Sequence, residues 1–311
     1  MKAIFFTFVF SLCLISVLAQ EPEMSGLSGY LQKAQYQQAI EYINRQEVSK
    51  DFLYQKALCY KSLNDFSKAI ELLEPLSEEY PEDIPVKLQL ALCYESTLSY
   101  LKGVDCYEKL MQIDSTNVFF QVRKADLLYR AEKYPVALEE YFAINPEFNP
   151  GYLTKSIAMC YDKLNQPDSA KVYFSNAWEI DAKDSFSALS LVKIHLKQED
   201  FQSALIVSEK FISRDSTNIQ MNILNAHTYY SLNRYEEAAG RFEKCRLQGD
   251  SSLTVNKSLG ISYYFLKNDS LAFPCLNQAY SQDTTNTNVL YALASVNYNL
   301  GYYPDAIKYY T

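Results

Sequence analysis

Residues 50–83 read KDFLYQKALCYKSLNDFSKAIELLEPLSEEYPED, and this stretch decides the fold. Its second alanine, Ala69, belongs to a column of small residues that runs through the chain: Ala39, Ala69, Gly103, Ala137, Ala170, Ala204, Ala238, Ala272 and Ala306. Six of the eight steps between these residues are 34 positions long. A fixed period of this length predicts a repeat array in which each unit packs on its neighbours.

A second column of small residues lies twelve positions before the first: Ala57, Ala91, Ala125, Ala158, Ala226, Gly260 and Ala294, with Val192 and Leu27 as exceptions. Aromatic rings accompany both columns, among them Tyr60, Tyr94, Tyr161, Tyr229 and Tyr263, and Tyr36, Phe66, Tyr100, Tyr134, Phe201, Tyr235 and Tyr303. Two antiparallel helices approach closely only where their side chains are small, and rings fill the gaps beside such contacts. The columns therefore predict helical hairpins.

A 34-residue unit with small residues at positions 8 and 20 and an aromatic ring at position 11 resembles the tetratricopeptide repeat. The clearest unit contains Leu53, Ala57, Tyr60, Ala69, Leu73 and Pro81. The resemblance covers nearly the whole chain after residue 19. It implies an all-α fold, an α-solenoid in which antiparallel helix hairpins form a right-handed superhelix. We expect about nine units over residues 20–311, starting near 20, 50, 84, 118, 151, 185, 219, 253 and 287, the first degenerate and the last incomplete.

Local signals predict where the helices begin. Pro135 and Pro304 fall in the first turn of a second helix, where a missing N–H costs nothing. Asp168 and Asp269 are predicted to cap such helices with their side chains. Pro274 lies about one turn inside the second helix of the eighth unit, which predicts a bend or a displaced start there.

Turn residues recur between the units. Asp-Ser-Thr-Asn at 114–117 and 215–218, and Asp-Thr-Thr-Asn at 283–286, have the chemistry of connecting turns. The richest cluster of helix-breaking residues is 144–151, INPEFNPG, which spans the single 33-residue step of the column. Two interpretations stay open for this cluster: a change in superhelical curvature, or an ordinary loop that is one residue short.

The first nineteen residues resemble a secretory signal peptide. Lys2 precedes an apolar run that ends at Leu18, and Val17-Leu-Ala19 offers a small-residue cleavage site. The run is shorter than the roughly 20 residues of a membrane span. We therefore expect an exported protein, periplasmic or secreted, with no membrane span after cleavage.

Six cysteines follow this segment, and three of them, Cys59, Cys93 and Cys160, occupy the same repeat position. Equivalent helices lie farther apart than the roughly 7 Å between Cα atoms that a disulfide requires. Buried free thiols are therefore favoured over bridges.

Composition and motifs argue against several functions. A formal charge of -8 leaves no basic surface for nucleic acid. Sequence motifs for phosphate loops, dinucleotide binding, zinc proteases and serine hydrolases are absent, so we predict no enzyme activity, catalytic residue, cofactor or metal site. His195 takes a ring position of the repeat and is expected to be packed and hydrogen-bonded, whereas His227 is expected to face the inner groove.

In the family that this chain resembles, the first helices line a concave groove through positions 2, 5, 9 and 12. Carried over residue by residue, the predicted groove contacts are Tyr54, Tyr129, Tyr152, Lys155, Lys193, His227, Tyr230, Lys257 and Tyr264. The same positions also hold Glu95, Asp126, Phe119, Phe186, Tyr291 and Tyr298. The Lys-Asn carboxylate clamp of some family members is missing, because Met159 and Ile261 follow Lys155 and Lys257 where the clamp has asparagine.

The leading interpretation is a non-enzymatic scaffold that binds a peptide or protein segment along the concave groove. One alternative is the repeat region of a larger envelope protein with a functional domain beyond Thr311, since the helical pattern is still running there. A second alternative is a carbohydrate-binding module that uses the aromatic groove. The partner's identity and the oligomeric state stay open.

Overall fold

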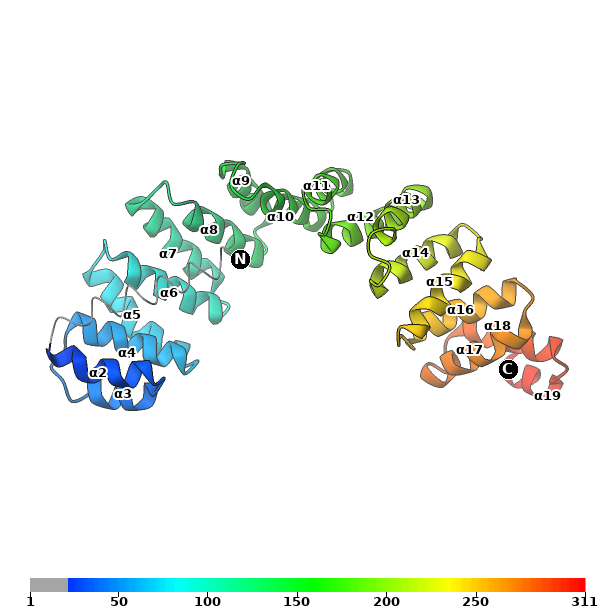
Figure 1. The fold of residues 1–311 in the computed structure, drawn as a ribbon, viewed down its shortest axis with the longest axis horizontal. Coiled ribbons are helices and arrows are strands. Elements are labelled where there is room, and N and C mark those ends of the chain that lie inside the picture. Colours follow the sequence, from blue (N-terminus) through cyan, green and yellow to red (C-terminus); the bar gives the residue numbers. More distant parts are fainter. Residues whose placement is uncertain (1–21, 311) are drawn as a thin grey trace. The chain divides into compact units, whose positions relative to one another are not determined.

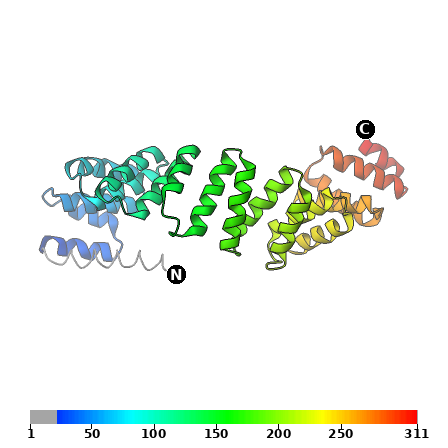
Figure 2. The ribbon, with the colours of Figure 1, turned by 90° about the horizontal axis from the view of Figure 1, so that it is seen from above.

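The structure is a computed structural model and describes residues 22–310. These residues form eighteen helices and no strand (Figure 1). Consecutive helices run antiparallel as hairpins, which Figure 2 shows from a second side. The predicted all-α class of stacked helix hairpins is confirmed. The predicted signal peptide, residues 1–19, lies outside the described residues. No helix among residues 22–310 is long and apolar enough to cross a membrane.

The chain divides into two compact units, one ending at Phe148 and the other beginning at Asn149. The first unit holds the hairpins α2 (Pro22–Gln32) with α3 (Tyr36–Ile43), α4 (Lys50–Ser62) with α5 (Phe66–Glu79), α6 (Ile84–Ser96) with α7 (Tyr100–Ile113), and α8 (Val118–Arg130) with α9 (Tyr134–Ala143). The boundary between the units falls inside the breaker cluster 144–151.

The second unit holds five hairpins: α10 (Pro150–Lys163) with α11 (Pro167–Ile180), α12 (Ser185–Lys197) with α13 (Phe201–Ile212), α14 (Ile219–Ser231) with α15 (Tyr235–Leu247), α16 (Leu253–Phe265) with α17 (Asp269–Gln282), and α18 (Thr287–Asn299) with α19 (Tyr303–Tyr310). The first helices begin within two residues of the predicted unit starts. Every second helix begins three residues before its member of the alanine column.

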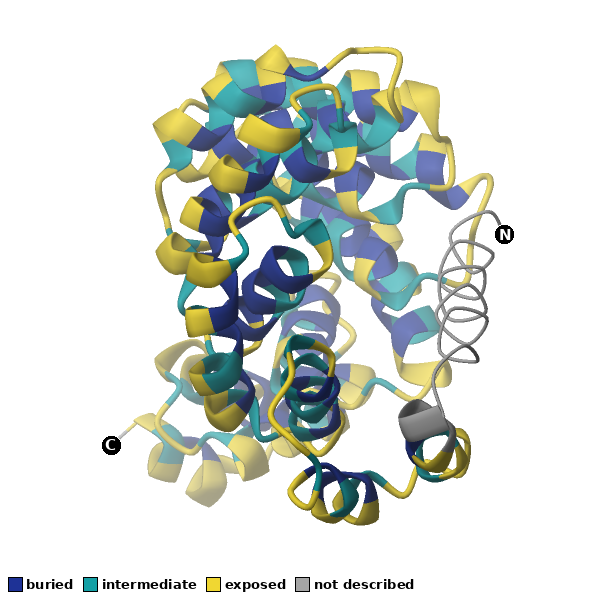
Figure 3. Cartoon of the chain, turned by 90° about the vertical axis from the view of Figure 1, so that its left-hand side faces the viewer, coloured by how far each residue is buried: buried dark blue, intermediate teal, exposed yellow. Residues whose placement is uncertain are grey.

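Both small-residue columns are buried at the contact between paired helices. All eight alanines of the first column are at most 3% exposed, and Gly103 is also buried. A Cβ added to Gly103 would lie 2.7 Å from Leu127 Cδ1, on the first helix of the next hairpin. Figure 3 shows the buried residues on helix faces that are turned toward neighbouring helices. At Gly103, therefore, the neighbouring helix leaves no room for a larger side chain unless Leu127 moves.

Each hairpin turn contains one residue in the left-handed region of the backbone, five positions before the alanine column: Ala34, Asn64, Leu98, Glu132, Asn165, Glu199, Asn233, Lys267 and Gly301. The N–H of the following residue donates to the carbonyl of the residue four before the left-handed one, at 2.8–2.9 Å in all nine turns. This bond is the long hydrogen bond of a Schellman motif. The motif ends the first helix and aims the chain into the second.

The connectors between hairpins have the predicted turn chemistry. Asn117, Asn218 and Asn286 accept hydrogen bonds from backbone N–H groups at the starts of α8, α14 and α18. The capping prediction for Asp168 and Asp269 is wrong. Both lie inside the first turn, and the residues at the cap positions are Gln166, which makes no side-chain cap bond, and Asn268, which accepts from Leu271 N.

The displaced start predicted at Pro274 is also wrong. Helix α17 begins at Asp269, in register with the other second helices, and continues through Pro274. Pro75 lies inside α5 in the same way. A proline at these positions removes one backbone hydrogen bond, and the packing of the helix against its neighbours compensates for that loss.

The six cysteines among the described residues are all free and buried: Cys59, Cys93, Cys106, Cys160, Cys245 and Cys275. This confirms the interpretation as buried thiols. Burial raises the pKa of Cys160 to about 12 and that of Cys59 to about 11. Thiols held in this way are poor nucleophiles and poor metal ligands.

Candidate functional site

Several first helices contact the first helix of the next hairpin. In the second unit α12 contacts α14, α14 contacts α16 and α16 contacts α18; in the first unit α4 contacts α6. Within the described residues, consecutive second helices have no comparable contacts. The first helices therefore form the more crowded, inner row of each unit, and the side chains on their inner surface, here called the first-helix face, are the candidate binding residues.

In the first unit the charges of the first-helix face are paired with one another. Glu95, which is 9% exposed, accepts a hydrogen bond from Tyr107 Oη at 3.0 Å and forms an ion pair with Arg123. Asp126 accepts from Tyr141 Oη at 2.7 Å. The carboxylates that the sequence places in the groove are thus already satisfied by protein donors.

The two tyrosines predicted as contacts in the first unit are both half-buried. Burial raises the pKa of Tyr54 to about 12, and the nearby Asp83 adds to this shift. Tyr129 packs edge-on against Tyr134 of the next helix, with ring centroids 5.3 Å apart. Both rings therefore take part in packing, and only part of each faces solvent.

The predicted contacts near the start of the second unit differ in exposure and in ion pairing. Tyr152 is half-buried. Lys155 Nζ lies 3.3 Å from Asp184, the residue that caps α12, so this lysine links two consecutive hairpins. Lys193, by contrast, is exposed on α12, and no ion pair among residues 22–310 includes it.

His227 and Lys257 lie close together on the first-helix face of α14 and α16. The half-buried His227 ring packs edge-on against Phe242 at 5.1 Å between centroids. Burial lowers the pKa of His227, and the positive charge of Lys257 lowers it further. No ion pair in the described part of the chain includes Lys257. A ligand carboxylate placed between these two side chains would relieve that repulsion.

Tyr230 and Tyr264 belong to a continuous group of four rings. Tyr230 contacts Tyr235 at 5.6 Å, Tyr235 stacks on Phe265 at 4.5 Å, and Phe265 contacts Tyr264 at 5.5 Å between centroids. Lys267 Nζ lies 5.5 Å from the centre of the Tyr264 ring. Because Tyr230 and Tyr264 also pack on the core of this unit, they act partly as structural residues.

The most exposed rings at first-helix-face positions are others. Phe119 is 49% exposed and Phe186 is 47% exposed, at the starts of α8 and α12. Tyr291 and Tyr298 on α18 are 59% and 61% exposed. Exposed rings suit the capture of apolar side chains from a partner.

A hydrogen bond between consecutive hairpins was not predicted from the sequence. Tyr94, Tyr229 and Tyr263 each donate to a glutamate twenty residues earlier, on the second helix of the preceding hairpin: Glu74, Glu209 and Glu243. The Tyr229–Glu209 distance is 2.8 Å. The only signal in the sequence was the repeated spacing of twenty residues between glutamate and tyrosine. That spacing indicates a hydrogen bond only when the positions of the two helices are known.

His195 is a structural residue, as predicted. Its Nδ1 lies 3.0 Å from Asp200 Oδ2 across the turn between α12 and α13. Within residues 22–310 no group of three or more histidine, cysteine, aspartate or glutamate side chains could hold a metal ion.

One hairpin matches a known family of repeats. Residues 51–83 match the family described as the tetratricopeptide repeat. The match spans one hairpin, α4 with α5. The tetratricopeptide repeat fold is typical of scaffolds for protein–protein interaction.

The chain is similar to several solved structures. One is a tetratricopeptide repeat protein from Parabacteroides merdae, which is 14% identical with a TM-score of 0.51, covering 79% of this chain and 98% of that one. MamA is 14% identical with a TM-score of 0.46, covering 49% of this chain and 90% of that one. A tetratricopeptide repeat protein from Thermus thermophilus is 18% identical with a TM-score of 0.38, covering 51% and 88%. No curated protein matches the sequence.

Proposed function

We propose that this protein is a non-enzymatic scaffold that binds a peptide or protein segment along the first-helix face of its second unit. The observation that carries the proposal is the contrast between the two units. Glu95 and Asp126 in the first unit are satisfied by neighbouring side chains, whereas Lys193 and Lys257 in the second unit form no ion pair among the described residues. Unpaired cations beside exposed rings favour a ligand segment with both acidic and apolar side chains.

The shape of this face favours a segment that runs across several hairpins. The candidate contacts repeat from one first helix to the next: Lys193 on α12, His227 on α14, Lys257 on α16 and Tyr298 on α18. An extended peptide or one face of an amphipathic helix would meet them in succession. Affinity would then come from a few apolar anchors, with the charges setting orientation.

A selection experiment tests the proposal. A random peptide library is displayed against the immobilised chain, and the affinity of the enriched peptides is measured by isothermal titration calorimetry. We expect acidic and aromatic peptides, and we expect Lys257→Ala and Tyr298→Ala to weaken binding by about tenfold each. Lys183→Ala, in an exposed connector, is the matched control and should leave binding unchanged.

Three outcomes would contradict the proposal. The first is a library that yields no enriched peptide. The second is an affinity that falls as much in Lys183→Ala as in Lys257→Ala. The third is binding to a glycan array without any peptide binding, which would favour the carbohydrate-binding interpretation of the rings.

We also propose that the protein is exported, on the evidence of the N-terminal apolar run alone. N-terminal sequencing of the protein purified from its own cells tests this proposal. A chain beginning at Gln20 would support it, and a chain that still begins at Met1 would contradict it.

A further inference from the structure

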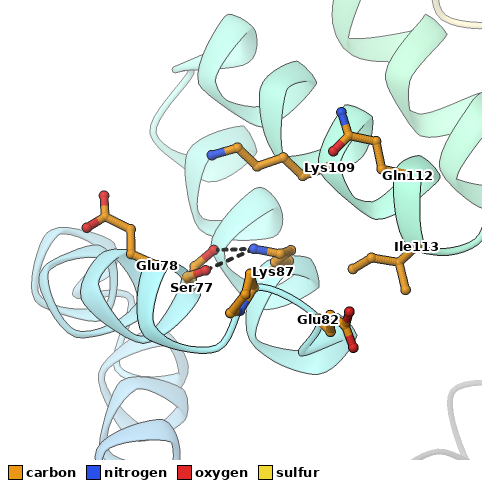
Figure 4. A pocket seen from close by; sticks show the side chains of 8 residues that line it. Ser77, Glu78, Glu82, Lys87, Lys109, Gln112 and Ile113 are labelled. Carbon is orange, nitrogen blue, oxygen red and sulfur yellow. Dashed lines mark hydrogen bonds between the residues drawn. The ribbon is translucent and has the colours of Figure 1, made fainter.

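A pocket of about 770 Å³ opens on the first unit where α5 and α7 end and α6 begins (Figure 4). It is separate from the first-helix face, because its walls come mainly from the last turns of two second helices and from the connector before α6. The chemistry of this pocket is set by two lysines, Lys87 and Lys109, and by two glutamates, Glu78 and Glu82.

Lys87 is a buried ammonium group that forms no ion pair among the described residues. The residue is 4% exposed. Its Nζ donates to the Ser77 carbonyl oxygen at 2.9 Å and to Ser77 Oγ at 3.0 Å, both neutral acceptors (Figure 4). Asp83 pairs with Lys50, and its charge raises the pKa of Lys87 by less than burial and Lys109 lower it. A buried charge that is solvated only by neutral groups is costly, so the site favours an anion.

Lys109 places a second positive charge at the same pocket. Burial lowers the pKa of Lys87, and the Lys109 charge lowers it further. Figure 4 shows both lysines and the Gln112 amide along the walls of the pocket. Two ammonium groups that repel one another and an amide donor are the elements that bind a carboxylate.

The rim of the pocket restricts the kind of anion. Glu78 and Glu82 are exposed there, and neither forms an ion pair among the described residues. Their negative charges disfavour a ligand with several negative charges and favour one with a cationic group beside its carboxylate. We propose that the pocket binds a small zwitterionic carboxylate, in the class of free amino acids and short peptides, with the carboxylate on Lys87 and Lys109 and the ammonium group toward the rim glutamates.

Isothermal titration calorimetry on the full chain tests the proposal with five probes: alanine, alanyl-alanine, acetate, ethylamine and inorganic phosphate. We expect alanine or alanyl-alanine to bind more tightly than acetate or phosphate, and ethylamine not to bind. Tighter binding of alanine indicates a free amino acid, and tighter binding of alanyl-alanine indicates a peptide. Lys109→Met should weaken that binding about tenfold, the loss of one charged hydrogen bond.

Two further variants complete the test. Lys102→Met changes an exposed lysine on α7 outside the pocket and should leave the affinity unchanged. Glu78→Gln together with Glu82→Gln should make acetate and alanine bind equally well. The proposal is overturned if none of the five probes releases heat, if phosphate binds most tightly, or if Lys109→Met binds like the unmodified chain. Lys109 is substituted rather than Lys87, because Lys109 is exposed and its replacement should not disturb folding.

Discussion

A Cβ atom added to Gly260 would lie 2.7 Å from Leu276 Cγ and 3.0 Å from the Leu276 backbone nitrogen. At this point α16 and α17 approach so closely that only glycine fits. Because one of the obstructing atoms is backbone, the neighbour cannot move aside by changing a rotamer. This contact explains why the second small-residue column has glycine at position 260.

The first prediction is that Gly260→Ala lowers the free energy of unfolding by about 1–3 kcal/mol through overpacking. Gly240 offers a matched control inside α15, because a Cβ there would meet no atom within 4 Å. Gly240→Ala should raise stability by about 0.5–1 kcal/mol, since alanine loses less backbone entropy than glycine in a helix. Urea denaturation followed by circular dichroism measures both. Equal changes in the free energy of unfolding for the two substitutions would contradict the close approach of α16 and α17.

Glu199 carries the second prediction, since it occupies the left-handed position of its turn with φ of 58°. A residue with a Cβ is strained there by roughly 1–2 kcal/mol, whereas glycine is not. Glu199→Gly should therefore stabilise the protein by about 1 kcal/mol. Gly301→Ala, at the equivalent position with φ of 83°, should destabilise it by a similar amount. Thermal melts should show a higher melting temperature for Glu199→Gly and a lower one for Gly301→Ala than for the unmodified chain. Changes of the same sign in both variants would contradict the prediction.

Tyr229 carries the third prediction. Its hydroxyl donates to Glu209 at 2.8 Å across two hairpins, and Glu209 also accepts from Asn225 and Arg241. Tyr229→Phe should cost about 0.5–1.5 kcal/mol of unfolding free energy. Tyr235→Phe is the control, because that hydroxyl bonds Asn233 in an exposed turn and should contribute little. A loss confined to Tyr235→Phe would argue against a role of the inter-hairpin bond.

The fourth prediction concerns pH. Burial and the charge of Lys257 lower the pKa of His227 below its usual 6.5, so the folded state holds the ring neutral. The unfolded chain binds a proton near its ordinary pKa, so it binds more protons than the folded chain as the pH falls. The contribution of His227 to stability is therefore complete above about pH 6.5 and is lost as the pH falls below it.

Urea denaturation at about pH 7.5 and about pH 5.5 measures this dependence. The unmodified chain should lose stability between the two values, and His227→Gln should lose less. The carboxylates titrate mostly below this window, and His195 is present in both proteins, so the difference between them reports on His227. An identical pH dependence in both proteins would exclude the buried neutral ring as the cause.

Thiol reactivity gives the fifth prediction. Because burial raises the pKa of Cys160 to about 12, its thiolate is scarce near neutral pH, and the other five described thiols are buried as well. A thiol reagent such as dithionitrobenzoate should react with none of the six in the native protein and with all six in urea. Fast labelling of any of these six thiols in the native chain, located by mass spectrometry, would contradict the burial, and missing thiols among them in urea would reveal a disulfide.

The hairpins could be predicted from the sequence because their determinant is local and periodic. Residues such as Ala57 and Ala69 must be small wherever two backbones meet, so the requirement recurs at every unit. Helix caps were less predictable: Asn268 caps α17, one residue before the predicted Asp269. Adjacent polar residues are equally able to cap, and only the backbone conformation decides which one does so.

The left-handed turn position was not predictable because its residue types disagree. Asn64 and Gly301 are typical of it, whereas Leu98 and Glu132 are not. Tertiary contacts of the two helices impose the turn, and the local sequence does not always favour it.

For the first-helix face, the sequence predicted which positions contribute but not the state of each side chain. Periodicity assigns Asp126 and Lys193 to the same face, but it does not tell which charge is paired and which is available. Tyr141 bonds Asp126 from a different helix. Lys87 was missed for a related reason, since lysine usually indicates an exposed site and its burial depends on three helices together.

The near-identical geometry of successive hairpins has a consequence for the length of the protein. Asn218 caps α14, and Leu253 begins α16 at the equivalent position of the next repeat. Removal of residues 219–252 would join Asn218 directly to Leu253, with a capping side chain still in front of a first helix. Whole repeats can therefore be deleted or duplicated in frame without a new turn or a new core. The length of the first-helix face can thus change during evolution by steps of one hairpin.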